Sequence, residues 1–383
     1  MPELPEVETV ARDLRGLVLG AEVTGARCSW PPTLRTHAPV AFTATIAGRR
    51  IEAVDRRAKL VVIALSGEAV LTIHLKMTGQ LFVVPGATPE DQYVRAVLEL
   101  ADGREIRFRD VRKFGRIGLY PRDPATGEPV TEPGGPAVFA GHGPEPLDPG
   151  FTLTAFRRRI RGRRGRLKPL IIDQSFLAGV GNIYADEALW RARLHPLRSA
   201  ATLRPPDERH LYHAIRDILG EAVAFRGSSI DDYTAPEGDG AMQERLAVYQ
   251  RTGEPCPRCG RPIRRIVIGA RSTHFCSWCQ RLPAGDRAGA RTILRTVTPR
   301  AGSAGKSPRS GTGRAEGGPG STRAGRRGPR WTERAAAGAL GLTPAEAAAA
   351  EARTRTERTR RAAASRRAAA RATTQHGSKG DGD

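Results

Sequence analysis

The apolar residues near the start of the chain recur at helical spacing. Val7, Val10, Leu14 and Val18 fall on one face if residues 5–19 form a helix. Gly20 follows directly, and glycine is common just after the end of a helix. The pattern predicts an amphipathic helix over residues 5–19 that packs one face on a core.

Short runs of apolar residues follow, with the lengths and boundaries typical of strands. The predicted strands span residues 51–54, 60–65, 69–74, 80–84, 93–100, 105–109 and 117–120. Asp102-Gly103 lies between two of these runs and favours a two-residue hairpin turn. Short strands at this spacing predict an antiparallel sandwich or barrel.

The pattern changes again in the middle of the chain. Residues 121–150 are rich in Pro and Gly and are expected to form a linker. Apolar positions then recur at helical spacing from residue 152 to residue 225. The chain is therefore predicted to be an α+β protein. Its expected parts are a β-sandwich with a helix (2–120), the linker (121–150), a helical domain (151–245), a metal module (246–282) and a tail (283–383).

The charge of the chain is strongly positive and unevenly distributed. The 62 Lys+Arg and 40 Asp+Glu residues give a net charge of +22. Residues 284–383 hold 21 Lys+Arg, 8 Asp+Glu and a single aromatic residue, so the tail alone carries +13. This composition buries too little apolar surface to offset chain entropy, which predicts a disordered tail after Leu282. The charge favours a polyanionic partner, nucleic acid first and an anionic membrane surface second.

The apolar content also excludes two classes of protein. No window approaches the ~20 consecutive apolar residues of a membrane-spanning helix. The first residues are acidic and lack an apolar segment, so no secretory signal is predicted. We therefore expect a cytoplasmic protein that is not embedded in a membrane.

Four of the five cysteines form two closely spaced pairs. These are Cys256 with Cys259 and Cys276 with Cys279, with sixteen residues between the pairs. Two such cysteine pairs predict a tetrahedral site in which four thiolates bind one Zn²⁺. The ion would be structural, because the four thiolates leave no coordination position for a substrate water. Arginines between the pairs, among them Arg271, would present charge to phosphates. Cys28 is expected to lie in a strand and to be a small core residue.

The N-terminus offers a second kind of chemistry. Removal of Met1 before a small residue would leave Pro2 as a terminal secondary amine. Attack of such an amine on a sugar aldehyde carbon gives an iminium, which is an electron sink for elimination. Glu3 and Glu6 lie close enough in sequence to move protons. Taken alone, Pro2 is better explained as a simple helix start.

Further motifs occur in a fixed order between residues 2 and 282. They are Pro2-Glu3-Leu4-Pro5-Glu6-Val7-Glu8, Arg57-Ala58-Lys59, His74-Leu75-Lys76-Met77-Thr78-Gly79, Arg112-Lys113-Phe114-Gly115 and Asp173-Gln174-Ser175-Phe176-Leu177-Ala178-Gly179-Val180-Gly181-Asn182-Ile183-Tyr184. With the cysteine module, this series resembles the formamidopyrimidine-DNA glycosylase/endonuclease VIII family. The tail has no counterpart in the family pattern.

The resemblance implies a bifunctional enzyme of base excision repair that acts on damaged double-stranded DNA. By that likeness the helical domain is a helix–two-turn–helix domain and the metal module is a zinc finger. Pro2 would be the Schiff-base nucleophile at the sugar C1′, and Glu3 would donate and accept protons. Lys59 and Arg271 would contact phosphates and assist β- and δ-elimination. The enzyme would act as a monomer on the bacterial nucleoid.

The likeness also assigns residues that hold the DNA. These are Asn182 and Lys168 at phosphates, Met77, Arg112 and Phe114 in the gap left by the everted nucleotide, and His74 and Arg163 in the same groove. Such roles are physically reasonable, because an enzyme that acts at C1′ must rotate the nucleotide out of the stack and replace the lost stacking.

The leading prediction for the substrate is oxidised purines, such as 8-oxoguanine and formamidopyrimidines. Two alternatives stay open: oxidised pyrimidines, as in the endonuclease VIII branch, and a non-catalytic zinc protein that binds DNA or RNA. The second is disfavoured because Pro2, Glu3 and Lys59 are all in place. In the loop 228–243 the family often has an aromatic residue where Ala241 or Met242 stands, and this departure bears on lesion preference.

Overall fold

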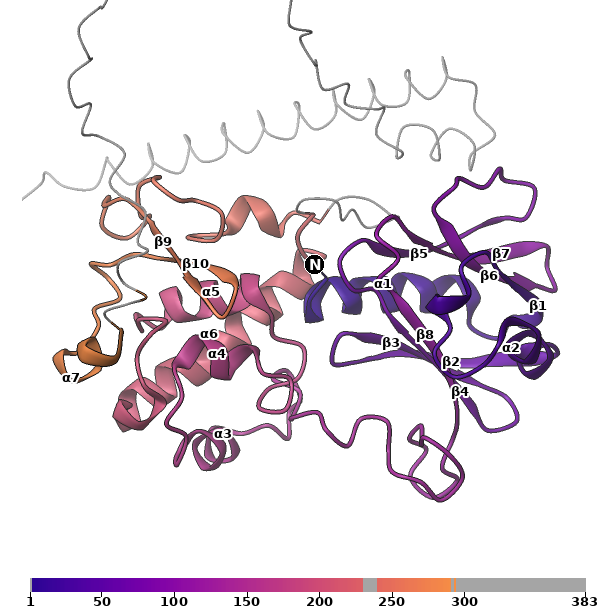
Figure 1. The fold of residues 1–383 in the computed structure, drawn as a ribbon, viewed down its shortest axis with the longest axis horizontal. Coiled ribbons are helices and arrows are strands. Elements are labelled where there is room, and N and C mark those ends of the chain that lie inside the picture. The colour runs from indigo at the N-terminus through magenta and orange to yellow at the C-terminus, as the bar shows by residue number, and fades with distance from the viewer. Residues whose placement is uncertain (1, 230–239, 291–292, 294–383) are drawn as a thin grey trace, which may run out of the picture. The chain divides into compact units, whose positions relative to one another are not determined.

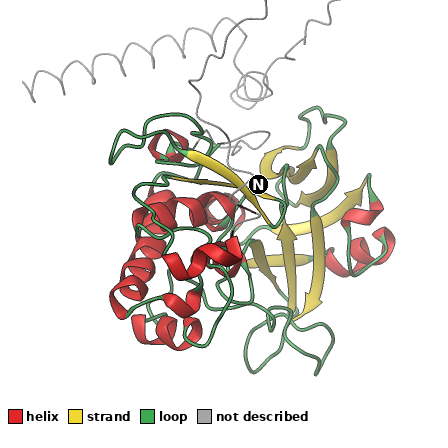
Figure 2. Ribbon diagram, turned by 60° about the vertical axis from the view of Figure 1, so that its left-hand side comes forward, coloured by secondary structure: helices red, strands yellow, loops and turns green. Residues whose placement is uncertain are grey.

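The computed structural model describes residues 2–229, 240–290 and 293 of the chain. Strands dominate the first part, helices follow, and a small hairpin comes after the helices (Figures 1 and 2). The predicted α+β class is confirmed. The helices are α1 (Leu4–Val18), α2 (Pro39–Ile46), α3 (Leu153–Ile160), α4 (Leu167–Ile172), α5 (Asn182–Arg191), α6 (Pro205–Ala224) and α7 (Ala284–Arg287). The strands are β1 (Glu22–Cys28), β2 (Arg49–Arg57), β3 (Leu60–Leu65), β4 (Ala69–His74), β5 (Gly79–Pro85), β6 (Val94–Leu100), β7 (Arg104–Asp110), β8 (Arg116–Pro121), β9 (Arg264–Ile268) and β10 (Arg271–Phe275).

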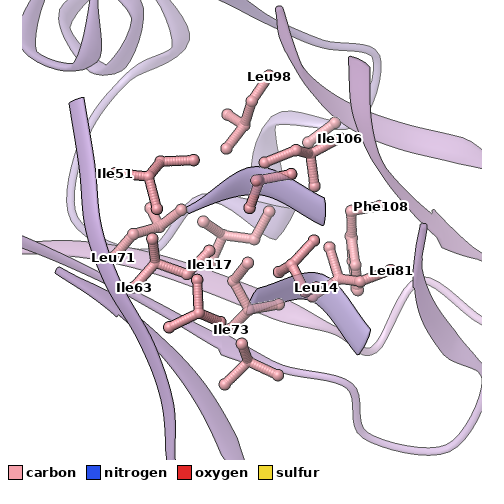
Figure 3. Close-up of a cluster of buried hydrophobic side chains, with 14 of the residues drawn as sticks. Leu14, Ile51, Ile63, Leu71, Ile73, Leu81, Leu98, Ile106, Phe108 and Ile117 are labelled. Carbon is pink, nitrogen blue, oxygen red and sulfur yellow. The ribbon is translucent and has the colours of Figure 1, made fainter. Parts of the chain in front are cut away.

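The first eight strands form one antiparallel sheet that folds into a sandwich. Their order is β5-β7-β6-β1-β2-β3-β4-β8, and β1 pairs with β2 through only two residue pairs. Side chains from both four-stranded halves meet in one core, including Leu98 and Ile106 from one half and Ile63 and Leu71 from the other (Figure 3). The core therefore lies between the two halves, as the predicted sandwich requires.

Helix α1 connects this sandwich with the helical domain. Its predicted apolar face, from Val7 to Val18, is buried in the sandwich core. Leu4, one turn earlier, belongs instead to the core of the helical domain, and its N–H donates to the Gly179 carbonyl at 3.0 Å. Because α1 enters both cores, the residues just before it lie at the junction of the two domains (Figure 1).

The segment between α4 and α5 approaches the start of α1 closely. Gly179 has a φ of +82°, and a Cβ there would lie 2.7 Å from the Cβ of Leu4. A Cβ on Gly181 would lie 2.4 Å from the carboxyl carbon of Glu3. Only glycine at these two positions therefore allows the segment before α5 to come this near to the start of α1.

The packed part of the chain extends past the predicted boundary at Leu282. Ala290 is fully buried in a cluster with Leu197 and Ile266, and Asp286 accepts a hydrogen bond from the Thr202 hydroxyl at 2.9 Å. The start of the tail thus packs on the helical domain. Most of the predicted tail, residues 294–383, and most of the predicted lesion loop, residues 230–239, lie outside the described residues.

Among the helices that the structure describes, none combines the length and the apolar character needed to cross a membrane.

Candidate active site and DNA-binding residues

Pro2 and Glu3 lie at the junction of the two domains, and both are buried. The Glu3 carboxylate accepts hydrogen bonds from the backbone N–H groups of Gly181 and Ile183, each at 2.8 Å, and of Tyr184 at 3.4 Å. These N–H groups open helix α5, and a helix N-terminus favours a negative charge. The helical domain thus holds the Glu3 carboxylate, although Glu3 directly precedes α1, the helix that packs on the sandwich.

Burial raises the pKa of Glu3 above its ordinary value, and the neighbouring Glu6 adds to the rise. The positive charge of Lys59 and the N–H of Ile183 oppose this rise. A carboxyl whose pKa is shifted toward neutrality can both give and take a proton. The placement of Glu3 beside Pro2 therefore suits general acid–base chemistry at a group bound to the Pro2 nitrogen.

Glu6 supports this arrangement and is itself fully engaged. One of its oxygens accepts the backbone N–H of Glu3 at 2.8 Å. The other accepts the hydroxyl of Tyr184 at 2.5 Å and the N–H of Ser228 at 2.8 Å. Burial, together with the charge of Glu6, raises the pKa of Tyr184 well above its ordinary value, so the phenol stays a donor. The sequence suggested proton transfer by either glutamate, and the structure makes Glu6 a support for Glu3.

Lys59 lies in the two-residue turn between β2 and β3. Ala58 takes a φ of +54°, as the first position of a type II′ hairpin turn requires, and Arg57 pairs with Leu60. The lysine is only 7% exposed, and among the described residues no carboxylate forms an ion pair with it. Burial lowers the pKa of Lys59, Glu3 opposes the shift, and Arg271 lowers the pKa further.

Glu145, from the segment predicted to be a linker, holds this turn in place. Its carboxylate accepts the N–H of Ala58 at 2.6 Å and pairs with Arg56 and Arg57, each at 2.7 Å. Sequence reasoning assigned no role to Glu145. Its position in a segment rich in Pro and Gly gave no signal of a partner so far away in the sequence.

Arg271 lies at the tip of the β9–β10 hairpin and is exposed. Ile268 pairs with Arg271 across a turn of Gly269 and Ala270, which have φ values of +55° and +60°. Two positive φ values define a type I′ turn, the form that best matches the twist of a hairpin. The charge of Arg271 lowers the pKa of Lys59, so the hairpin tip lies near enough to Lys59 for their charges to interact.

Lys168 is placed differently from the prediction. It is 1% exposed, and its Nζ donates to the Asp186 carboxylate at 2.6 Å and to the Ser272 carbonyl at 3.0 Å. Asp186 also accepts the N–H of His274 at 2.8 Å. The buried pair satisfies the ammonium group inside the protein and connects α4 and α5 with the zinc hairpin. Lys168 is therefore a structural link in this conformation, and its contact with a phosphate stays a prediction.

The other residues predicted to bind DNA line the surface. Met77 and Phe114 are 37% and 45% exposed, although large apolar side chains are usually buried. The guanidinium carbon of Arg112 lies 5.0 Å from the centre of the Phe114 ring. His74, Met77 and Phe114 border a groove of about 660 Å³. Burial, with the charge of Lys76, lowers the pKa of His74 to about 3, so this imidazole is neutral at physiological pH.

Asn182 and Arg163 lie on the helical domain. Asn182 is the first residue of α5, and its side-chain oxygen is buried without a hydrogen-bond donor among the described residues. Buried polar atoms in native proteins are normally satisfied, so this oxygen is open to a donor from water or a ligand. Arg163 is exposed in the loop after α3. The structure thus leaves Arg163 accessible to a partner, whereas Asn182 is only partly exposed and its side-chain oxygen is buried.

The four cysteines come together as predicted. Their Sγ atoms all lie within 4.8 Å of one another, and no other group of this kind occurs in the described part of the chain. The Trp190 indole N–H donates to the Cys256 Sγ at 3.4 Å, a contact that suits a thiolate. Four convergent sulfurs on two knuckles fit one tetrahedral Zn²⁺. The zinc ion is structural, because the protein supplies all four ligands.

Three family models match the chain in the order of these domains. They are the formamidopyrimidine-DNA glycosylase N-terminal domain at residues 1–117, the H2TH domain of the same enzyme at 142–234 and a zinc finger found in FPG and IleRS at 253–282. The formamidopyrimidine-DNA glycosylase of Chloroflexus aurantiacus is 49% identical over 282 residues, which cover 73% of this chain and 98% of that protein. The chain belongs to the formamidopyrimidine-DNA glycosylase family.

Solved structures agree with this assignment. The MutM (FPG) protein of Thermus thermophilus is 43% identical, with a TM-score of 0.64 and coverage of 74% of this chain and 100% of that one. A Lactococcus lactis FPG variant, solved with DNA that contains Fapy-dG, is 34% identical with a TM-score of 0.66. It covers 73% of this chain and 100% of that chain.

Membership of the glycosylase family confirms the predicted class of activity. The chain is a DNA glycosylase of base excision repair with one structural zinc ion. The alternative of a non-catalytic zinc protein is set aside by this result. The glycosylase site also contains supporting residues for which the sequence alone suggested no role, namely Glu145, Tyr184, Asp186 and Ser228.

Proposed function

We propose that this glycosylase removes oxidised purines from duplex DNA through a Schiff base on Pro2 and then cleaves the strand. The observation that carries the proposal is the contact between the two domains at Glu3, which puts a buried carboxyl with a raised pKa beside Pro2 and Lys59. Once Met1 is removed, the Pro2 nitrogen is a terminal secondary amine. This geometry fits attack at a sugar carbon followed by proton transfer.

The first stage is base loss. The Pro2 nitrogen forms a bond to C1′ as the bond from C1′ to the base breaks, and the base leaves with that electron pair and a proton. Glu3 protonates the sugar ring oxygen as the ring opens, which leaves an iminium between Pro2 and C1′. Lys59 neutralises the carboxylate that remains.

The second stage is strand cleavage by β- and δ-elimination. Loss of a proton from C2′ gives an enamine that expels the 3′ phosphate from C3′ and restores the iminium. Loss of a proton from C4′ then supplies the electrons that expel the 5′ phosphate from C5′. The iminium receives the electrons in both steps. Lys59 and Arg271 would hold the two phosphates, because their positive charges converge on the same site.

The remaining predicted residues would hold the DNA open. Met77, Arg112 and Phe114 would fill the space of the everted nucleotide, since they combine an apolar side chain, a ring and a guanidinium at one exposed place. Asn182 and Arg163 would contact phosphates. His74 would contribute hydrogen bonds and no charge, because its pKa is about 3.

The preference for oxidised purines rests on the relatives. A relative solved with DNA that contains Fapy-dG shares the fold over 73% of this chain. The test is cleavage of matched duplexes that carry 8-oxoguanine, a formamidopyrimidine or thymine glycol. We expect faster cleavage of the two purine lesions. Faster cleavage of thymine glycol would assign the chain to oxidised pyrimidines instead.

We also propose the setting in which the enzyme works. It would act as a monomer in the bacterial cytoplasm, associated with the nucleoid, which fits its strongly positive charge. Sedimentation of the protein with and without a lesion duplex tests the monomer, and a complex of two chains on one duplex would contradict it.

A further inference from the structure

Two neighbouring loops present the residues that would fill the DNA stack. The first loop connects β4 to β5 and contains Met77, and the second connects β7 to β8 and contains Arg112 and Phe114. Gly79, the first residue of β5, pairs directly with Asp110, the last residue of β7. The two loops therefore leave the sheet side by side.

The carboxylate of Asp110 joins the two loops. One oxygen accepts the Thr78 hydroxyl of the first loop at 2.5 Å and the Arg112 N–H of the second at 3.2 Å. The other oxygen accepts the N–H of Gly115 at 2.7 Å. The Thr78 hydroxyl in turn accepts the Arg112 N–H at 3.1 Å. Thr78 and Asp110 thus form the hydrogen-bonded bridge between the loops.

The bridge is buried and carries no cationic partner. Asp110 is 1% exposed and Thr78 is 2% exposed. Among the described residues, no Lys, Arg or His forms an ion pair with Asp110. A buried carboxylate without a cation is costly, so its use here needs a reason. The reason is that the three groups bonded to it, the Thr78 hydroxyl and the N–H groups of Arg112 and Gly115, are all donors, and carboxylate oxygens accept.

The rest of the second loop is equally constrained. Lys113 has a φ of +60°, and its ammonium group lies 4.0 Å from the centre of the Trp30 ring. A Cβ on Gly115 would lie 2.2 Å from the Phe108 ring. Because Lys113 and Gly115 are constrained in this way, the second loop has little freedom of its own. The position of Arg112 and Phe114 relative to Met77 then depends on the bridge through Asp110.

We propose that Asp110 is a positioning residue that fixes the spacing of Met77, Arg112 and Phe114 so that they enter the duplex as one unit. The proposal rests on the proposed function, because it takes these three side chains to fill the gap of the everted nucleotide. Asp110 touches neither the sugar nor the base. Its effect would appear only where a base pair must be opened.

Two substitutions remove the bridge with little change of volume. Asp110→Asn replaces one acceptor with an N–H₂ group, which must then face the N–H of Gly115 or of Arg112. Thr78→Val removes the hydroxyl, whereas Thr78→Ser keeps it and should restore activity. Thr33→Val is the matched control, because the Thr33 hydroxyl is buried and has no partner among the described residues.

The experiment compares two substrates in single-turnover conditions. One is a duplex with 8-oxoguanine, and the other is a single-stranded abasic oligonucleotide that has no base pair to open. We expect Asp110→Asn and Thr78→Val to slow excision in the duplex about tenfold, the scale of one lost hydrogen bond to a charged group. Borohydride trapping on the single strand should stay within about twofold of the native chain. The fluorescence of 2-aminopurine opposite the lesion should show slower insertion of the loops.

The outcomes separate this proposal from the proposed function. Equal losses on both substrates, or no loss on the duplex, would overturn the role of Asp110 while the Schiff-base mechanism stands. Failure of Thr78→Ser to recover the activity that Thr78→Val loses would overturn it as well. If the native chain forms no trapped adduct on either substrate, the proposed function fails, and the role of Asp110 fails with it.

Discussion

At the scale of single residues, two buried charges define the site. Burial raises the pKa of Glu3 and lowers the pKa of Lys59, and each charge limits the shift of the other. A pair of this kind is costly to the fold and useful to proton transfer. The sequence supplied both residues through their motifs. It held no indication that the N–H groups of a helix almost two hundred positions away would hold Glu3.

Glu3→Gln should bind lesion DNA and fail to release the base. The amide cannot transfer a proton, and its N–H₂ group would face the N–H donors of Gly181 and Ile183. We expect the rate of base release to fall by roughly 10²-fold or more, the usual contribution of a general acid–base group. Gel-shift affinity and base release are measured on the same duplex. Base release at the native rate would remove Glu3 from the mechanism.

Lys59→Met should raise stability and lower activity. Since burial lowers the pKa of Lys59, the folded protein holds this charge less readily than the unfolded chain does. Removing it should therefore raise the free energy of unfolding at neutral pH. The folded protein binds fewer protons here, so the advantage of the variant should shrink as pH rises toward the ordinary pKa of lysine. Urea unfolding at several pH values measures this, and a destabilised variant would contradict the account.

At the scale of elements, segments with a regular apolar spacing were predictable from the sequence, and segments without one were not. Helix α1 follows its apolar spacing, with bounds within one residue of the prediction. Strand β1 contains two buried residues among polar ones and gave no such pattern, so only Cys28, its last residue, was expected to lie in a strand. Lys168 was expected at a phosphate from the family resemblance, yet the Asp186 carboxylate of α5 holds its ammonium group inside the protein. Partners that are distant in sequence decide such cases.

Cys256→Ser should disrupt the zinc finger and, with it, DNA binding. A lost thiolate should weaken zinc binding by more than ~10-fold, since changes merely adjacent to zinc ligands already have that effect. The β9–β10 hairpin, which carries Arg271, would no longer be held by the metal site. Zinc content and duplex affinity are measured together. Cys28→Ser is the control, because Cys28 lies in β1 outside the four-cysteine cluster. Full affinity in a zinc-free variant would contradict this prediction.

At the scale of the whole molecule, the site exists only where two domains meet. Pro2 and Glu3 precede the helix that enters both cores, Lys59 comes from the sandwich, and the amide donors come from the helical domain. The sequence predicted these domains separately. Their contact at Glu3 depends on Gly179 and Gly181. The sequence suggested that these glycines let the backbone approach a phosphate, and only the fold shows their close approach to Leu4 and Glu3.

Residues 294–383 are expected to act as an electrostatic tether to DNA. The segment from residue 284 onward has a net charge of +13, and Asp286 and Ala290 pack on the folded part, so a chain ending at residue 293 is the informative deletion. Single-turnover excision at saturating enzyme should stay unchanged. The slope of log K against log salt should become shallower by about 0.9 for each phosphate that the shortened chain no longer neutralises. Equal slopes and affinities would exclude the tether.

The most direct test of the account is to identify the atom that bonds to the sugar. The native protein is treated with borohydride on a duplex that contains 8-oxoguanine, and the trapped adduct is digested and sequenced by mass spectrometry. We predict a single adduct on the peptide that begins at Pro2, and no adduct with Pro2→Gly although that variant still binds the duplex. An adduct on Lys59, or undiminished trapping by Pro2→Gly, would contradict the central claim.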